Sequence, residues 1–130
     1  YGLVGLKTHS KITLIVRREN GRIRRYVHLS TGNYNDVTAN IYTDHGMMTC
    51  REDIGEDASA FFNNMATGNL DGHYTYLIVS PTSLKQKILY LMDEEIKKGS
   101  NGRIIMKMNS VTDVDFIQKE IKERRINSVI

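Results

Sequence analysis

The sequence ITLIVRRENGRIRRYVHL, residues 12–29, decides the fold of the first half of the chain. Residues 12–16 are apolar except for Thr13, and residues 23–29 alternate apolar with polar or charged side chains. Both patterns predict β-strands. Asn20 and Gly21 lie between them, and both residue types tolerate the positive φ that a type I′ turn requires. We therefore expect two antiparallel strands within residues 11–30.

The segments that follow this hairpin predict a sheet covered by a helix. Residues 31–36 are rich in turn-forming residues, and a short helical stretch is expected before Tyr42. Residues 46–50 suggest another short strand. Residues 55–66 predict a helix that packs its apolar side against the sheet; that side consists of Ala58, Phe61, Phe62 and Met65.

The second half of the chain alternates strand and helix patterns. Residues 68–72 have the composition of a linker and predict a domain boundary, after which residues 74–79 and 103–108 resemble strands. Between those strands, Pro81 precedes an amphipathic helix that ends near Gly99, and a further helix is expected over residues 113–124. The apolar stripe of the first helix comprises Leu84, Ile88, Leu91, Met92 and Ile96. This order predicts a mixed α/β (α+β) fold.

Composition places the chain among ordinary globular proteins. Its 130 residues are 40% hydrophobic and 25% charged, and no apolar run approaches the length of a membrane-spanning helix. A lone cysteine, Cys50, can form neither an internal disulfide nor a zinc site with a second thiol, which favours a reducing cytoplasm. The start at Tyr1 and the strand-like end at residues 127–130 predict that the chain is a fragment.

An arginine cluster occupies the predicted hairpin. Five arginines fall within nine residues although the net charge of the whole chain is only +3. Such a cluster suits a polyanion, and it is equally consistent with a solvated surface. Its members are Arg17, Arg18, Arg22, Arg24 and Arg25.

The triplet His9-Ser10-Lys11 directly precedes the apolar strand. If the strand extends back to it, His9 and Lys11 project on the same side, where an imidazole could attack a phosphoryl group whose oxygens the ammonium neutralises. A three-residue pattern is weak evidence by itself. The hairpin, however, should return Thr31-Gly32-Asn33 to the same place, where Asn33 can donate hydrogen bonds to phosphate and Gly32 allows close backbone approach.

Several longer strings resemble the polyphosphate kinase family, which belongs to the phospholipase-D-like superfamily. They are GLKTHSKITLIVRRENGRIRRYVHLSTGNYN, TANIYTD, IGED, SPTSLKQKILYLMDEEI and RIIMKMNSVTD, and together they cover nearly the whole chain. The resemblance implies a phospholipase-D-like sheet with flanking helices and two incomplete lobes. Residues 1–70 would be the C-terminal part of the first catalytic domain, and residues 71–130 a linker and the N-terminal part of the second.

The same resemblance assigns roles to particular residues. His9 matches the histidine that the family phosphorylates, Lys11 the lysine of its HxK motif, and Tyr42 a tyrosine that contacts the nucleotide. Two departures stand out: Ser30 replaces the family's usual glycine, and residues 12–16 lack the aspartate typical of phospholipase-D-like hydrolases. The latter argues against a plain phosphodiesterase. The family's N-terminal nucleotide-binding region, its Mg²⁺-associated arginines and its second histidine would lie outside this chain.

The resemblance therefore implies an ATP:polyphosphate phosphotransferase that works through a phosphohistidine. Its substrates would be ATP or ADP and polyphosphate, with Mg²⁺ held by ligands outside the fragment and no metal site within it. Neither a nucleic-acid partner nor a transmembrane segment is expected. We expect a cytoplasmic homo-oligomer in the full-length protein, with or without membrane association through the complex, and an inactive isolated fragment.

Two other functions remain open from the sequence. A phospholipase-D-like phosphodiesterase or nuclease would use the same His9 and Lys11, and a non-catalytic polyanion-binding module would use the arginine cluster. Other histidines compete with His9 as nucleophile: His28 is expected to be packed or hydrogen-bonded, whereas His45 and His73 lie in predicted loops. Without the resemblance, Tyr42 would be a core aromatic.

Overall fold

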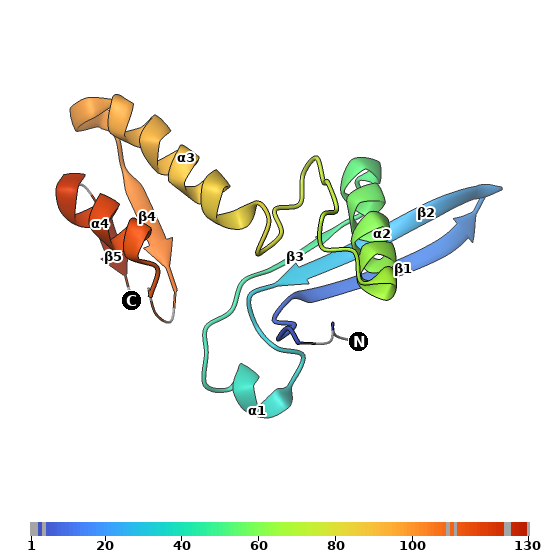
Figure 1. Cartoon of the computed structure of the whole chain (residues 1–130). Helices are drawn as coiled ribbons and strands as arrows, with labels where there is room; N and C mark the ends of the chain where they lie inside the picture. The colour runs from blue at the N-terminus through green and yellow to red at the C-terminus, as the bar shows by residue number, and fades with distance from the viewer. Residues whose placement is uncertain (1–2, 4, 109, 111, 124–125, 130) are drawn as a thin grey trace. The chain divides into compact units, whose positions relative to one another are not determined.

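The computed structural model describes residues 3, 5–108, 110, 112–123 and 126–129. The chain divides into two compact units, Tyr1–Ile78 and Val79–Ile130. Figure 1 shows the elements of each unit. The predicted mixed α/β class is confirmed, because the first unit pairs an antiparallel sheet with a helix and the second combines helices with a parallel strand pair.

The first unit is built on the predicted hairpin. Strands β1 (Lys11–Glu19) and β2 (Arg22–Ser30) pair antiparallel from Lys11↔Ser30 to Glu19↔Arg22. Asn20 and Gly21 adopt φ values of 49° and 77°, which are the positive angles expected of a type I′ turn. Strand β3 (Gly46–Thr49) adds antiparallel to β2, so the sheet order is β1-β2-β3.

Helix α2 (Glu52–Thr67) covers one face of this sheet, as Figure 1 shows. Two acidic residues in its first turn suit the positive end of the helix dipole, and Gly68 ends it in the left-handed conformation, with φ of 72°. The core between helix and sheet is a cluster of Val27, Ile54 and Ala58, around which Ile12, Leu14, Leu29 and Leu77 pack. Phe61 is buried as predicted, whereas Phe62 is exposed.

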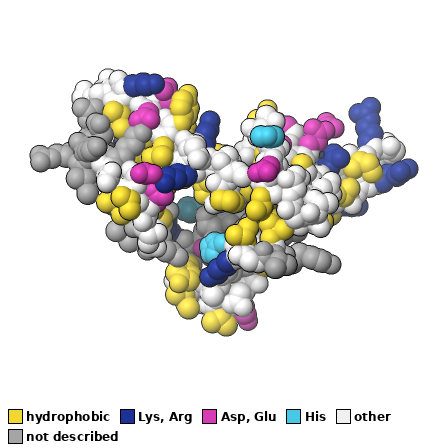
Figure 2. Space-filling view, in the orientation of Figure 1, with side chains coloured by type: hydrophobic (Ala, Val, Ile, Leu, Met, Phe, Trp, Pro, Cys, Tyr) yellow, Lys and Arg dark blue, Asp and Glu magenta, His cyan; other side chains and the backbone are white. Residues whose placement is uncertain are grey.

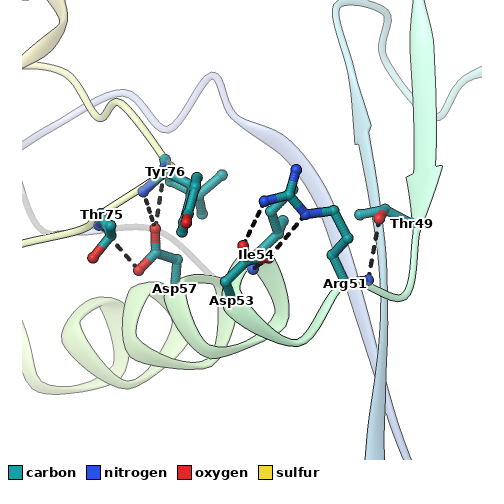
Figure 3. Close-up of polar contacts among 8 residues, drawn as sticks. Thr49, Arg51, Asp53, Ile54, Asp57, Thr75 and Tyr76 are labelled. Atoms are coloured by element: carbon teal, nitrogen blue, oxygen red, sulfur yellow. Dashed lines mark hydrogen bonds and ion pairs between the residues drawn. The ribbon is translucent and has the colours of Figure 1, made fainter.

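The predicted strand over residues 74–79 is wrong. This segment contains no strand, because the carboxylate of Asp57 on α2 binds its backbone in place of a neighbouring strand (Figure 3). The N–H groups of Thr75, Tyr76 and Leu77 donate to Asp57 at 3.2, 2.6 and 2.9 Å. A side-chain carboxylate therefore satisfies donors that the sequence pattern had assigned to a sheet.

The second unit follows the predicted order of elements. Helix α3 (Leu84–Lys97) precedes a 3₁₀ turn (Gly99–Asn101), strand β4 (Ile104–Lys107), helix α4 (Val114–Glu123) and strand β5 (Ile126–Val129). Strands β4 and β5 pair in parallel, as strands joined by a crossover helix do. Residue 124, the predicted end of α4, lies outside the described residues.

An ion-pair network joins two helices of the second unit. The Lys85 ammonium on α3 lies 2.8 Å from a carboxylate oxygen of Asp113 and 2.6 Å from one of Asp115, both at the start of α4. Asp113 also accepts the N–H groups of Asp115 and Phe116, which caps α4. Among the described residues, no helix is long and apolar enough to cross a membrane.

Candidate functional site

Three segments meet at the end of the sheet where β1 begins. Lys11, the first residue of β1, pairs with Ser30, the last residue of β2, and Ser30 in turn pairs with Gly46 at the start of β3. Residues 31–33 and 44–45 therefore lie beside the start of β1. The predicted return of the Thr31-Gly32-Asn33 segment to this end of the hairpin is confirmed.

His9 lies just outside the regular strand. Strand β1 begins at Lys11, so the argument that both side chains share one face of a continuous strand does not apply to His9. The two residues are nevertheless linked, because the Lys11 ammonium donates to the His9 backbone carbonyl at 2.6 Å. His9 itself is exposed, which leaves its imidazole accessible to a substrate.

Charges around Lys11 act on its ammonium in opposite directions. Partial burial lowers the pKa of Lys11, and the positive charge of Lys7 lowers it further, while the carboxylate of Asp44 opposes both; the net pKa lies below the ordinary value for lysine. An ammonium surrounded in this way gains from a nearby anion. A phosphate placed beside Lys11 would relieve its repulsion from Lys7.

Gly32 and Asp44 fit against each other in this loop. A Cβ atom at position 32 would lie 2.0 Å from Asp44 Oδ2, so the buried glycine makes room for the carboxylate. The Gly32 N–H donates to Ser30 Oγ at 3.0 Å. The glycine was expected to let a phosphate approach the backbone, yet here its missing side chain accommodates Asp44.

Backbone and hydroxyl bonds hold the two loop segments together. The Thr31 N–H donates to the His45 carbonyl at 2.9 Å, and the His45 N–H donates to Thr31 Oγ1 at 2.9 Å. Thr31 Oγ1 also lies 3.5 Å from Asp44 Oδ1. This reciprocal pairing fixes the position of Asp44 relative to Gly32 and the start of β1.

Asn33 and Tyr42 flank the short helix α1 (Asp36–Ala39). Asn35 caps that helix, since its side chain accepts the Thr38 N–H at 2.9 Å. Asn33 is exposed and its carbonyl accepts the Asn35 N–H. The Tyr42 side chain is also exposed, so the alternative that it is a core aromatic is wrong for the described residues.

The other histidines differ from His9 in their surroundings. His28 is half-buried, and its Nδ1 lies 2.8 Å from the Tyr34 hydroxyl, which confirms the prediction that it is hydrogen-bonded. A Cβ atom on Gly46 would approach His28 Nε2 to 3.0 Å. His45 and His73 are exposed in irregular segments, as expected.

The described part of the chain offers no ready metal site. Within it, no group of three or more His, Cys, Asp or Glu side chains could hold a metal ion. Mg²⁺ in phosphoryl-transfer sites needs oxygen ligands from carboxylates and phosphates. Asp44, the carboxylate nearest to the candidate site, is already placed against Gly32, so these residues do not fit a Mg²⁺ site by themselves.

Sequence reasoning missed the contributions of Lys7 and Asp44. Both affect Lys11, yet neither was singled out, although Asp44 ends the quoted string TANIYTD. The proximity of Asp44 depends on the pairing of β2 with β3, which brings residue 46 opposite residue 30. A prediction of that strand register could have found it.

Comparison with known proteins assigns both units to one family. The family described as "Polyphosphate kinase C-terminal domain 1" matches residues 1–70, and "Polyphosphate kinase C-terminal domain 2" matches residues 77–125. Two similar relatives, both named polyphosphate kinase, come from Exiguobacterium sibiricum and Bacillus cereus. They are 55% and 52% identical to the chain over 122 residues, which is 92% of this chain and 17% of each relative.

A solved structure is also similar to this chain. The crystal structure of polyphosphate kinase from Porphyromonas gingivalis matches with a TM-score of 0.78 and 30% identity. The match covers 95% of this chain and 21% of that one. The chain thus corresponds to about a fifth or less of the length of these relatives.

Proposed function

The chain belongs to the polyphosphate kinase family, and from this premise we propose that it forms part of an enzyme that reversibly transfers the γ-phosphate of ATP to a polyphosphate chain through His9. In the first step, an imidazole nitrogen of His9 attacks the γ-phosphorus, the bond to the bridging oxygen breaks, and ADP leaves. In the second, a terminal oxygen of polyphosphate attacks the same phosphorus and the P–N bond breaks. The polymer is then one phosphate longer.

The observation that supports this proposal is that His9, Lys11 and the loop after β2 lie together at the start of β1. His9 is exposed, and its backbone carbonyl accepts a hydrogen bond from the Lys11 ammonium, whose pKa is lowered first by partial burial and then by Lys7, against the opposing effect of Asp44. Phosphoryl transfer depends on positioning and on neutralising the phosphate oxygens. Lys11 supplies positive charge, and Asn33, exposed in the loop that returns to the start of β1, can donate hydrogen bonds to phosphate oxygens, whereas the missing side chain of Gly32 accommodates Asp44.

The remaining roles follow from the family. Tyr42 contacts the nucleotide with its exposed ring. Mg²⁺ would neutralise phosphate charge, and its ligands belong to other parts of the full-length protein. Residues 1–70 are the end of the first catalytic domain and residues 71–130 the linker and start of the second. The full-length enzyme is a cytoplasmic homo-oligomer, and this segment alone is inactive.

Labelling from ATP tests the nucleophile. Full-length enzyme incubated with ATP labelled at the γ-position should form an acid-labile adduct that His9→Ala abolishes. His45→Ala, which removes an exposed histidine from the neighbouring loop, should retain the label and serves as the matched control. Mass spectrometry of peptides kept at alkaline pH would locate the adduct.

The outcomes separate this proposal from its rivals. Label that persists in His9→Ala would contradict it. A phosphodiesterase would cleave diesters and take no label from the γ-position. A polyanion-binding module would bind polyphosphate without forming any adduct, and its binding would be insensitive to His9→Ala.

A further inference from the structure

The two faces of the hairpin differ sharply in character. Side chains alternate along each strand, and the core residues Leu14 and Val27 place one face against α2. The opposite face is called the cationic face here. It presents Lys11, Thr13, Ile15, Arg17 and Glu19 of β1 opposite Ser30, His28, Tyr26, Arg24 and Arg22 of β2.

Positive charge is concentrated at the turn end of this face. Figure 2 shows Lys and Arg side chains gathered at the hairpin tip, at the right of the view. Arg17 and Arg24 lie directly opposite each other, with side chains 65% and 53% exposed. Like charges in such a pair repel unless an anion lies between them.

Glu19 supplies part of that compensation. Its carboxylate lies 3.4 Å from Arg17 and 3.9 Å from Arg24, and the Tyr26 hydroxyl donates to both of its oxygens at 3.0 Å. Within β1 and β2 it is the only carboxylate, whereas the cationic face carries four basic residues. Asp44 offsets part of the charge of Lys11, so the surplus of positive charge lies at the turn end, where Glu19 accompanies Arg17, Arg22 and Arg24.

The surplus charge is aligned with the proposed reaction site. Lys11 and Arg17 lie on the same face of the same strand, six residues or roughly 20 Å apart. Between them the face carries Thr13 and the His28–Tyr34 pair, which are polar, and then Ile15 and Tyr26. A linear polyanion that reacts beside Lys11 could run along this strand to the arginines.

We propose that Arg17 and Arg24 form a subsite for the polyphosphate chain, which binds phosphates several units away from the end that reacts at His9. This inference rests on the proposed function, since it assigns a path to the polymer of the same reaction. The occupant is a linear polyphosphate because its closely spaced negative charges match a row of cations with a single internal carboxylate. The pair would distinguish long chains from short ones.

Chain-length dependence tests the subsite in the full-length enzyme. The variant Arg17→Gln/Arg24→Gln, assayed for ATP formation from ADP, should raise KM for long-chain polyphosphate by about tenfold or more. KM for tripolyphosphate should stay unchanged, because that substrate is too short to reach from Lys11 to Arg17. The dependence of long-chain binding on salt should also weaken, by a slope of about one per arginine removed.

A matched control lies on the other face of the same hairpin. Arg18→Gln/Arg25→Gln removes the same charge from the face that packs on α2 and should leave both KM values unchanged. Glu19→Gln, which removes the internal anion and keeps an acceptor for Tyr26, should lower KM for long chains. Thermal unfolding of each variant would check that the fold is intact.

Several results would overturn the subsite. One is an equal rise in KM for long-chain polyphosphate in both double variants. Another is an equal rise in KM for long-chain polyphosphate and for tripolyphosphate in Arg17→Gln/Arg24→Gln. The third is no change in either KM in that variant. Single-stranded RNA that competed through the same two arginines would identify a general polyanion patch instead. Failure of the proposed function would appear in the wild type, as no labelled His9 and no polymer, whereas failure of the subsite would leave wild-type activity intact.

Discussion

Asp44 occupies the space that any side chain at position 32 would need. Three atoms of its side chain lie 2.0–2.8 Å from an ideal Cβ on Gly32, which is closer than real carbon atoms approach. The same carboxylate acts on Lys11 and lies near the Thr31 hydroxyl. The absence of a side chain at Gly32 therefore allows Asp44 to lie where its carboxylate acts on Lys11.

The variant Gly32→Ala tests this relation. The added methyl group should displace Asp44 and lower the free energy of unfolding by about 1–3 kcal/mol, as overpacking does. Combining it with Asp44→Gly, which removes all three clashing atoms, should abolish most of that cost. Urea denaturation of the wild type, of each single variant and of the double variant would measure the free energy of unfolding of all four proteins. An equal cost with and without Asp44 would show that the contact is unimportant.

At the scale of elements, the β1–β2 hairpin sets the geometry of both the site and the cationic face. Its nine cross-strand pairs fix which residues share a face, and its turn fixes the register. Gly21 has a φ of 77° and no atom within 4 Å of an added Cβ, so a substitution there changes only backbone strain.

Gly21→Ala should therefore destabilise the protein by about 1–2 kcal/mol, the cost of a left-handed residue that carries a Cβ. Asn20→Gly, at the neighbouring turn position with φ of 49°, should have a much smaller effect because glycine adopts that angle readily. The midpoint of thermal unfolding reports both changes. A loss for Asn20→Gly as large as that for Gly21→Ala would refute the role of the turn.

Local patterns predicted these elements where the partners lay close in sequence. The hairpin followed from alternation and Asn20-Gly21, and α2 and α3 from apolar spacing, because each depends on neighbouring residues. The segment 74–79 was misassigned because its backbone partner, Asp57, lies about twenty residues away on a helix. Asp44 escaped notice for the same reason, since only strand register brings it to Lys11.

At the scale of the whole molecule, Asp57 decides which unit the segment 74–78 joins. Its side chain is only 8% exposed and binds three successive N–H groups of this segment, which is grouped with the first unit. The sequence predicted a domain boundary at the preceding glycine-rich linker, and that domain assignment stays a prediction. The hydrogen bonds from Thr75, Tyr76 and Leu77 to Asp57 attach this segment to α2, which explains why the first compact unit extends to Ile78.

Asp57→Asn should loosen this tie in a pH-dependent way. Burial raises the pKa of the Asp57 carboxyl, but hydrogen bonds from Leu77, Tyr76 and Thr75 outweigh it, so the net pKa lies below the ordinary value. The carboxylate thus stabilises the fold fully above its unfolded-state pKa of about 3.9, and this contribution is lost as the pH falls through the lower folded-state pKa.

We therefore expect Asp57→Asn to cost about 2–4 kcal/mol near neutral pH, with the difference from wild type shrinking below about pH 4. Hydrogen exchange should show lost protection at residues 75–77. The control Asp71→Asn removes a carboxylate from an exposed side chain and should change neither property. If the difference in stability between Asp57→Asn and wild type stays constant down to strongly acidic pH, the ionised Asp57 carboxylate does not stabilise the fold.

The two-residue turn between β1 and β2 also bears on how the molecule assembles. A tight turn joins β1 and β2, so their contacts with each other are local in sequence, and hairpins of this kind close in about 1–10 μs. Lys11 and the residues after Ser30 become neighbours as soon as the pair Lys11↔Ser30 forms, before α2 packs against the sheet. The order of folding would thus place the candidate site at the start of β1 among the earliest native features of the chain.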